Sequence, residues 1–332
     1  MPEFAIVTGT HIAELLDGQD SHVIELVREA YLTHHDGDSV NPDSHFLRFP
    51  QKPDARIIAL PAYLGGKVGL AGLKWISSFP QNVRSGQQRA SAVLILNDFE
   101  TGYPLALLES AAISAARTAA SAALAAITLG TAAPRSVGVV GAGLIARTVC
   151  RYLASAGVDL TTVRCHDLDQ HSAGRLASHL SDAHGSHATT GTLADALDCD
   201  LVLLATTAPA PYIDEPHALR PGQLVLNISL RDLAPQLLLT ANNVLDDLDH
   251  CLKANTSPHL AEQLTGSRDF VTGTLAGVLR GEVPLDAQRP TVFSPFGLGV
   301  LDLAVGHHVY RTAASSGRLL TVPGFFGDTA RW

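Results

Sequence analysis

Ser-Val-Gly-Val-Val-Gly-Ala-Gly-Leu-Ile-Ala, residues 136–146, is the strongest indication of the fold in this chain. An apolar, strand-like run leads into closely spaced glycines, and a helical pattern follows them. Gly141 permits a tight turn, and Gly143 lets the backbone approach a pyrophosphate. Ala146, in the third small position, allows close packing of the helix on the strand. The segment therefore predicts a strand–turn–helix that binds a dinucleotide, with the phosphates at the helix N-terminus.

The residue that follows the next strand-like run, Thr162–His166, indicates which nucleotide binds. Asp167 follows it, about where an acidic residue accepts hydrogen bonds from the adenosine ribose. A carboxylate there repels a 2′-phosphate and the next residues hold no arginine to bind one, which favours NAD over NADP. A domain that binds another nucleotide, or none, is the alternative. The candidate cofactor-binding residues are Gly141, Ala142, Gly143, Leu144, Ile145, Asp167 and Thr206.

The chain around this motif predicts two domains. From Pro134 to Leu301 strand-like runs alternate with helical stretches, which is typical of a doubly wound parallel sheet of the Rossmann type. The first 130 residues begin with a helical pattern and continue as short extended runs, closed by an alanine-rich helix at Ala111–Leu129. They predict an α+β domain. We expect one domain to comprise residues 1–130 with 303–332, and the dinucleotide-binding domain to comprise residues 131–302.

Composition narrows the classes of function. The 332 residues include 23 Lys plus Arg and 32 Asp plus Glu, a net charge of −9, which argues against nucleic-acid or membrane partners. The longest apolar tract, residues 114–134, is interrupted by Arg117, so a buried helix fits better than a membrane span. Four separated cysteines and an N-terminus without a leader pattern predict a reduced, cytoplasmic protein. No metal-ligand pattern is present, and we expect no metal.

Four charged residues are candidates for a substrate site. Arg48 and Lys74 stand in apolar, strand-like runs, and Arg117 interrupts the alanine-rich helix. Asp232 follows the strand-like run Leu224–Ile228, at the edge where parallel sheets bind ligands. Taken singly, each basic residue is more often structural, reaching solvent or pairing with a carboxylate. Together they favour a site for a carboxylate-bearing substrate, because arginine binds carboxylates bidentately and a desolvated lysine exchanges protons near neutral pH.

Other conspicuous residues are assigned structural roles. Asp246-Asp-Leu-Asp249 reads as a solvated strand end, and Trp75 as a packing residue. Four histidines between positions 171 and 187 fall on an expected helix and its loop without an HExxH pattern. They predict a solvated surface rather than a metal site.

These motifs resemble the ornithine cyclodeaminase/mu-crystallin family over nearly the whole chain. The matching pieces are Gly-Leu-Lys-Trp at 72–75, Ser114–Ala120, Val140–Ala146, Asp232 and Gly297–Asp302. The resemblance implies a substrate-binding domain, joined by the C-terminal tail, that forms a homodimer. It also implies that bound NAD acts at the α-carbon of an amino acid. Arg48 and Arg117 would hold the substrate α-carboxylate, and Lys74 would contact it or move a proton. Asp232 would serve the substrate nitrogen.

Within that family the chain is similar to one branch. Ornithine cyclodeaminases carry a glutamate in the strand that here reads Ile57–Pro61, where no carboxylate stands. The N-(2-amino-2-carboxyethyl)-L-glutamate dehydrogenases, which make 2,3-diaminopropionate for siderophores and peptide antibiotics, match better. Their substrate carries three carboxylates, which suits further cations such as Arg89 or Arg231. The segments similar to this branch are Asn41–Pro50, Arg56–Gly65, Trp75–Asn82 and Asn97–Pro104.

The resemblance implies an oxidoreductase in which Lys74 or Asp232 is the base. It would use NAD to oxidise the glutamyl α-carbon of this amine, and water would then release 2-oxoglutarate and L-2,3-diaminopropionate. One alternative is ornithine cyclodeaminase or another amino-acid or imine oxidoreductase of the family. The other is a nucleotide-binding, crystallin-like protein without catalysis. The four charged candidates together argue against the latter, because a pure binding protein has no need of a buried anion-binding group.

Overall fold

The computed structural model describes residues 3–130 and 134–327, and their contacts divide the chain into two compact units. Unit 1 comprises Met1–Arg117 with Leu298–Trp332, and unit 2 comprises Thr118–Gly297. The boundaries that the sequence suggested lie further along the chain, at residues 130 and 302. They differ because the chain changes units within a single continuous helix, α3 (Ala111–Leu129), and because all of α11 (Gly299–Ser315) belongs to unit 1.

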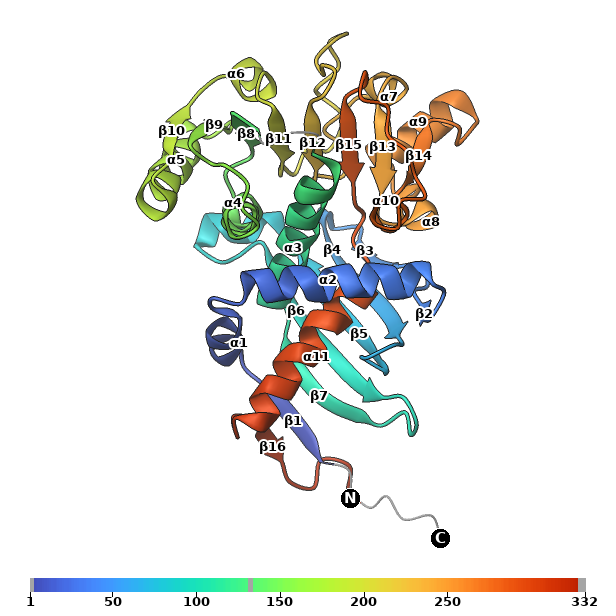
Figure 1. Ribbon diagram of the computed structural model, residues 1–332. Coiled ribbons are helices and arrows are strands. Elements are labelled where there is room, and N and C mark those ends of the chain that lie inside the picture. Colours follow the sequence, from blue (N-terminus) through green and yellow to red (C-terminus); the bar gives the residue numbers. More distant parts are fainter. Residues whose placement is uncertain (1–2, 131–133, 328–332) are drawn as a thin grey trace. The chain divides into compact units, whose positions relative to one another are not determined.

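Unit 1 is built on a mixed sheet with helices on one face. Figure 1 draws α2 (Asp20–His35) and α11 in front of the strands, and both helices contact β4. Because β16 pairs antiparallel with β1, the C-terminal tail joins the N-terminal sheet, as expected. In spatial order the strands are β16 (Leu320–Val322), β1 (Phe4–Val7), β7 (Pro104–Glu109), β6 (Ala90–Asp98), β5 (Leu70–Ser78), β4 (Lys52–Leu64) and β2 (Ser39–Val40), with β3 (His45–Phe49) paired to β4.

The register of strands β4, β5 and β6 decides which side chains of unit 1 share a face. Lys74 of β5 lies opposite Leu60 of β4 and Leu94 of β6. Since successive side chains alternate between faces, these three point to the side covered by α11. A Cβ on Gly306 of α11 would lie 2.3 Å from Leu94 Cδ2, so glycine permits this close packing of helix on sheet. Trp75 points to the other face and is 41% exposed, so its expected packing role is wrong within this chain.

Unit 2 is a parallel sheet in the Rossmann order, which confirms the predicted fold class. The chain moves outward from β8 through β9 to β10, and then returns to β11 and β12 on the other side of β8. Strands β13 and β14 lie beyond these, and the last strand, β15, comes back between β12 and β13. The sequence missed β10, β14 and β15, because polar residues or glycine interrupt these short runs and leave no apolar stretch to recognise. In spatial order the strands are β10 (His187–Thr190), β9 (Thr162–His166), β8 (Val137–Val140), β11 (Leu201–Leu204), β12 (Leu224–Asn227), β15 (Thr291–Ser294), β13 (Asn242–Leu245) and β14 (Val271–Thr274).

The remaining helices are mostly short. Helix α3 is long and apolar enough to cross a membrane, but 72% of the relevant window is buried inside the protein, as expected for a core helix. The others are α1 (Gly9–Leu16) and the 3-10 helix η1 (Pro80–Ser85) in unit 1, and α4 (Leu144–Ser155), α5 (Gln170–His184), α6 (Leu193–Leu197), α7 (Pro235–Leu238), α8 (Leu248–Cys251), α9 (Ser257–Thr265) and α10 (Leu275–Leu279) in unit 2.

Candidate active site

The glycine loop of unit 2 joins β8 to α4 as the sequence predicts. Gly141 has φ +91°, and a Cβ there would lie 2.5 Å from the Ala205 carbonyl oxygen, so only glycine makes this turn. Gly143 is different, because a Cβ there would meet nothing within 4 Å. It is the N-cap of α4 and contributes no side-chain cap to the free N–H groups of the first turn. The loop thus offers open space beside uncapped donors, which fits a pyrophosphate.

Asp167 lies beside this loop. Its Oδ2 accepts a hydrogen bond from the Ala142 N–H at 2.7 Å, and its Oδ1 accepts one from the Asp169 N–H at 2.8 Å. These two bonds hold the carboxylate at the carboxyl end of β9, next to the turn that would carry the phosphates. The position fits a carboxylate that accepts from ribose hydroxyls and repels a 2′-phosphate.

A second polar group of unit 2 forms around Asp232, which is fully buried. The Thr206 hydroxyl donates to its carboxylate, with Oγ1 2.8 Å from Oδ1, and the Tyr212 hydroxyl donates to Oδ2 at 3.1 Å. Burial raises the pKa of Asp232, and these hydroxyl donors oppose that rise only in part. Asp232 therefore holds its proton closer to neutral pH than an exposed aspartate, as a group that exchanges protons must.

Two residues around Asp232, Thr206 and Tyr212, add to what the sequence suggested. The hydroxyl of Thr206, a candidate for cofactor binding, is directed to Asp232, so its contact with a cofactor stays a prediction. Sequence reasoning missed Tyr212, because a single tyrosine in a proline-rich loop carries no spacing signal. The pKa of Tyr212 is raised by burial and by the neighbouring Asp232 carboxylate, so the phenol stays protonated and donates.

Two cations of unit 1, Lys74 and Arg117, converge on one carboxylate, that of Asp302 in the first turn of α11. Lys74 Nζ lies 2.6 Å from Asp302 Oδ2, and Arg117 Nε lies 3.3 Å from Oδ1. Both cations also donate to the hydroxyl of Ser114, at 3.4 Å from Lys74 Nζ and 3.3 Å from Arg117 Nη2. Lys74 is 2% exposed and Asp302 is completely buried, so water stabilises this group very little.

This group can bind an anion. When Lys74 is protonated, two positive charges share one negative charge, and the unbalanced charge is costly in a buried position. Burial, and then repulsion from Arg117, lower the pKa of Lys74 to about 8 although Asp302 acts in the opposite direction. A substrate carboxylate would balance the charge, and Lys74 is tuned to exchange a proton just above neutral pH.

Sequence reasoning found Lys74 and Arg117 but missed their partner. A lone acid in the otherwise apolar run Gly299–Val305 was the available signal for Asp302. The structure does not join Arg48 to this group. Arg48 is exposed on β3, where its guanidinium carbon lies 5.0 Å from the centre of the Phe46 ring. Its role in carboxylate binding stays a prediction.

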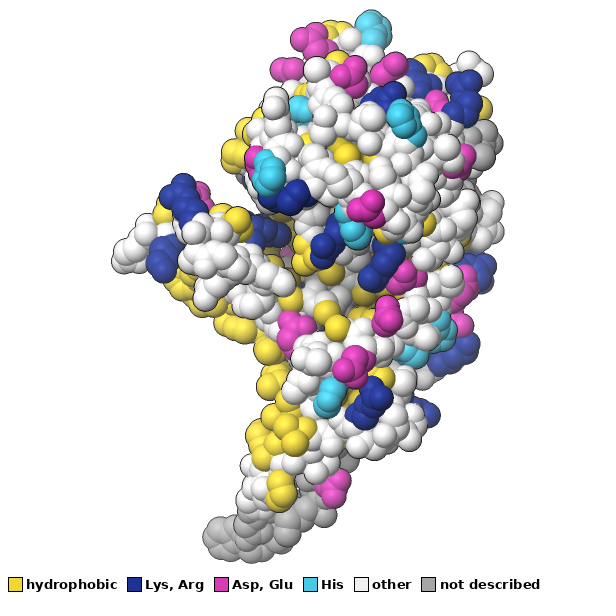
Figure 2. All heavy atoms as spheres, turned by 90° about the vertical axis from the view of Figure 1, so that its left-hand side faces the viewer, with side chains coloured by type: hydrophobic (Ala, Val, Ile, Leu, Met, Phe, Trp, Pro, Cys, Tyr) yellow, Lys and Arg dark blue, Asp and Glu magenta, His cyan; other side chains and the backbone are white. Residues whose placement is uncertain are grey.

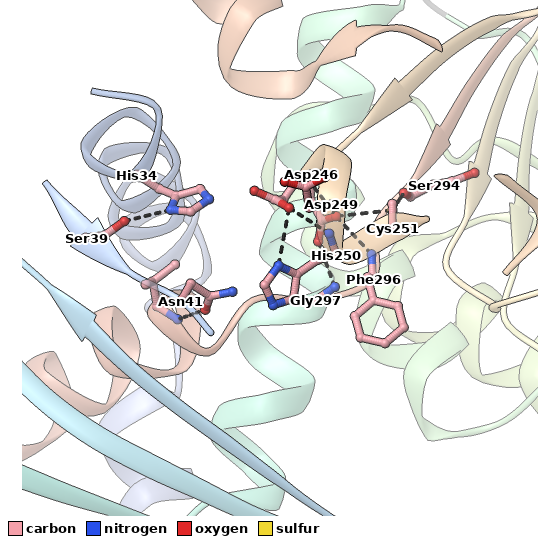
Figure 3. A network of polar contacts seen from close by, with 12 residues as sticks. His34, Ser39, Asn41, Asp246, Asp249, His250, Cys251, Ser294, Phe296 and Gly297 are labelled. Atoms are coloured by element: carbon pink, nitrogen blue, oxygen red, sulfur yellow. Dashed lines mark hydrogen bonds and ion pairs between the residues drawn. The ribbon is translucent and has the colours of Figure 1, made fainter. Parts of the chain in front are cut away.

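The expected solvated strand end at residues 246–249 is wrong for its first residue. Asp246 is 2% exposed, and its carboxylate accepts from the backbone N–H groups of Phe296 at 3.0 Å and Gly297 at 2.7 Å (Figure 3). The Cys251 thiol donates to the Ser294 carbonyl within the same network. Asp246 is buried because it satisfies backbone donors of the segment after β15, and burial raises its pKa.

The described side chains offer neither a metal site nor a reactive thiol. Within residues 3–130 and 134–327, no group of three or more His, Cys, Asp and Glu side chains is placed to hold a metal ion. The four cysteines are free thiols and are all buried. Burial raises the pKa of the Cys150 thiol to about 12 and that of the Cys165 thiol to about 11, so neither is a reactive thiolate.

Comparison with known proteins identifies the family to which this sequence is similar. The model of the ornithine cyclodeaminase/mu-crystallin family matches residues 6–317. An N-((2S)-2-amino-2-carboxyethyl)-L-glutamate dehydrogenase of Staphylococcus aureus is 28% identical over 314 residues, 90% of this chain and 93% of that protein. An alanine dehydrogenase of Archaeoglobus fulgidus is 28% identical over 329 residues, 94% of this chain and 96% of that protein.

A solved structure agrees with the fold. The archaeal alanine dehydrogenase dimer with bound NAD superimposes with a TM-score of 0.85 and 25% identity. The match covers 97% of this chain and all of the other. The similarity thus extends over both units rather than over the nucleotide-binding unit alone.

Proposed function

This chain belongs to the ornithine cyclodeaminase/mu-crystallin family, and within that family we propose that it is an NAD-dependent dehydrogenase of N-(2-amino-2-carboxyethyl)-L-glutamate. The observation that carries the proposal is the buried group of Lys74, Arg117 and Asp302, two cations that share one anion. Such a group favours a substrate with a carboxylate, and the Staphylococcus aureus relative supports this particular amine. The chain is an oxidoreductase acting on a C–N bond.

The reaction removes two electrons and then adds water. The glycine loop and Asp167 would hold NAD+, which would supply the acceptor for the hydride of the glutamyl α-carbon. The secondary amine nitrogen would lose its proton. Water then adds to the resulting C=N bond, and the C–N bond breaks to give 2-oxoglutarate and L-2,3-diaminopropionate. The protein contributes position and charge, since orientation of this kind is worth about 7–11 kcal/mol of the barrier.

The side chains of each unit have separate roles in this scheme. Arg117 binds the α-carboxylate, and Lys74 adds to the positive charge that attracts it only while Lys74 is protonated. Lys74, with a pKa of about 8, takes the amine proton at Nζ when it is neutral. Asp232, whose pKa is raised by burial, serves the nitrogen through its carboxylate, held by the hydroxyls of Thr206 and Tyr212.

Other reactions of the family define the second candidate. The Archaeoglobus fulgidus alanine dehydrogenase has the same identity to this chain, so oxidation of a simple amino acid is the nearest rival. Ornithine cyclisation is less favoured because residues 57–61 of β4 carry no carboxylate. A non-catalytic nucleotide-binding protein is disfavoured because it would not need the buried cation group of unit 1.

The deciding experiment follows NADH fluorescence after the purified protein is mixed with NAD+ and one amine. Parallel reactions contain N-(2-amino-2-carboxyethyl)-L-glutamate, L-alanine or L-ornithine. We expect NADH and 2-oxoglutarate in equal amounts from the first substrate alone. NADH from alanine, or proline and ammonia from ornithine without net NADH, would contradict the proposal and identify the rival.

The proposal includes a homodimer that works in the cytoplasm. Apolar side chains share the outer face of the unit 1 sheet, among them Ile57, Leu73, Trp75 and Ile95. Figure 2 shows hydrophobic side chains in a strip along the left edge of its lower half. An apolar face of this kind suits a second copy of the chain. The free cysteines suit a reducing compartment, and the product would supply a siderophore or peptide pathway.

Trp75 tests the assembly. Trp75→Glu places a charge on the apolar face, so we expect light scattering after gel filtration to report a monomer where the wild type is a dimer. Leu168→Glu, at a 98% exposed position of unit 2, is the matched control and should leave the mass unchanged. A wild-type monomer, or a dimeric Trp75→Glu protein, would contradict this part of the proposal.

A further inference from the structure

Arg89, which directly precedes β6, is a half-buried cation of unit 1. Its Nη1 donates to the Ser78 hydroxyl at 2.7 Å, and its carbonyl oxygen accepts from the Phe79 N–H at 2.8 Å. Within the described residues no acidic side chain pairs with it. Burial lowers the pKa of Arg89, because the guanidinium charge loses part of its hydration there.

Arg231, the other extra cation suggested by the sequence, is in a different situation. Its Nη2 donates to the Ala254 carbonyl at 3.0 Å and its Nη1 to the Pro209 carbonyl at 3.5 Å. Both contacts tie together loops of unit 2, so this guanidinium already has a structural use. Arg89 uses one nitrogen, Nη1, in its hydrogen bond to Ser78, so other N–H groups of its guanidinium can donate to a ligand.

The Ser78 anchor lies on the same face of the sheet as Lys74. Both are on β5 and four residues apart, so their side chains share a face and their Cα atoms are separated by about 13 Å. Arg48 belongs to the row of Ser78, because Arg48 pairs with Arg56 and Arg56 pairs with Ser78. One face of unit 1 therefore carries cations in two rows, that of Lys74 and that of Ser78.

The spacing suits two carboxylates of one molecule. A substrate made of two amino-acid units spans about 7 Å when extended, at 3.3–3.6 Å for each unit. The long side chains of Lys74 and Arg89 can span the rest of the distance between the two rows. A monocarboxylate, in contrast, can occupy only one of the two rows.

We propose that Arg89, anchored on Ser78 and with Arg48 in the same row, binds a second carboxylate of the substrate and selects di- and tricarboxylates over monocarboxylates. The inference rests on the proposed function in placing the first carboxylate at Lys74 and Arg117. It goes further by assigning the specificity to a residue outside that group.

The first test measures binding without turnover. Quenching of NADH fluorescence would report the binding of 2-oxoglutarate, with two carboxylates, and of pyruvate, with one, to the protein–NADH complex. We expect Arg89→Gln to reduce the preference for 2-oxoglutarate by about 10- to 100-fold, and Arg89→Lys to restore part of it. Arg84→Gln, on the exposed helix η1, is the matched control and should keep the wild-type preference.

The second test separates this inference from the proposed function. With N-(2-amino-2-carboxyethyl)-L-glutamate, Arg89→Gln should raise KM far more than it lowers kcat, and the melting temperature should stay within a few degrees. An unchanged ratio of 2-oxoglutarate to pyruvate affinity in folded Arg89→Gln would overturn the inference, whatever the turnover. If wild-type protein forms no NADH from this amine, the proposed function fails, and the affinity ratio still decides the role of Arg89.

Discussion

The glycine loop of unit 2 and the cation group of unit 1 recognise negative charge by different means. The loop offers backbone N–H groups at the start of α4, and its partner Asp167 is close in sequence. The cation group uses side chains only, and Lys74 and Asp302 are 228 positions apart. A backbone site depends on conformation, so it is sensitive to which glycine is replaced. A side-chain site depends on every charge in it, so it is sensitive to the loss of any partner.

Removing the shared anion should have the largest effect. Asp302→Asn keeps the shape of the side chain but leaves two buried cations unbalanced, and we expect a loss of about 3–5 kcal/mol in the free energy of unfolding. Denaturant unfolding at pH 7 measures it. Asp249→Asn breaks an exposed ion pair with Arg268, and we expect it to cost at most about 1 kcal/mol. Equal losses in both variants would show that the unit 1 group carries no special charge balance.

Removing one cation should affect turnover more than folding. Arg117→Ala takes away a carboxylate-binding guanidinium, and we expect kcat/KM to fall by about 100-fold or more because the α-carbon is misplaced. NADH binding should stay at the wild-type level, since the loop is in unit 2. Fluorescence titration and steady-state kinetics measure the two quantities. Arg135→Ala, at a residue whose side chain is 90% exposed, is the control, and unchanged turnover of Arg117→Ala would remove Arg117 from the site.

Two glycines of the loop should separate folding from cofactor binding. Gly141→Ala would force a Cβ against the Ala205 carbonyl at positive φ, so we expect a stability loss of about 1–3 kcal/mol. Gly143→Ala meets no protein atom, so it should keep the melting temperature and weaken NADH binding instead. Thermal melts and NADH titrations distinguish the two outcomes. Full NADH affinity in Gly143→Ala would mean that no phosphate approaches this backbone.

The pH dependence of kcat/KM should show the smallest effect, and it tests whether Lys74 is the base. Because its pKa is lowered to about 8, the neutral amine that accepts a proton becomes more abundant as pH rises through 8. We therefore expect kcat/KM for amine oxidation to rise severalfold between pH 7 and pH 9. Lys67→Met, which removes an exposed lysine, should leave this profile unchanged. A rate that falls through pH 8 would assign the base to Asp232 and leave Lys74 as a cation.

Local patterns predicted much of the fold. The helix Ala111–Leu129, the helix Gly299–Ser315 and the strand Thr162–His166 have the expected bounds, because each is long or regular enough to show its period. The four-residue strands β10, β14 and β15 were missed because polar residues or glycine interrupt their apolar character, whereas β8, β11 and β12, of the same length, are almost wholly apolar. Trp75 was misjudged because alternation along β5 identifies two faces but does not say which one is covered.

Local sequence was enough to predict the dinucleotide strand–turn–helix and its acidic partner, because a turn, a helix start and the end of the next strand depend on neighbouring residues. The sequence also identified Lys74 and Arg117 as candidates, because each is a charged residue in an otherwise apolar run. The folded structure was needed to find that Asp302 balances both charges, that Asp246 is buried and that Arg89 is held on Ser78. These contacts follow from strand register and helix packing, which bring together residues distant in the chain and which no local pattern records.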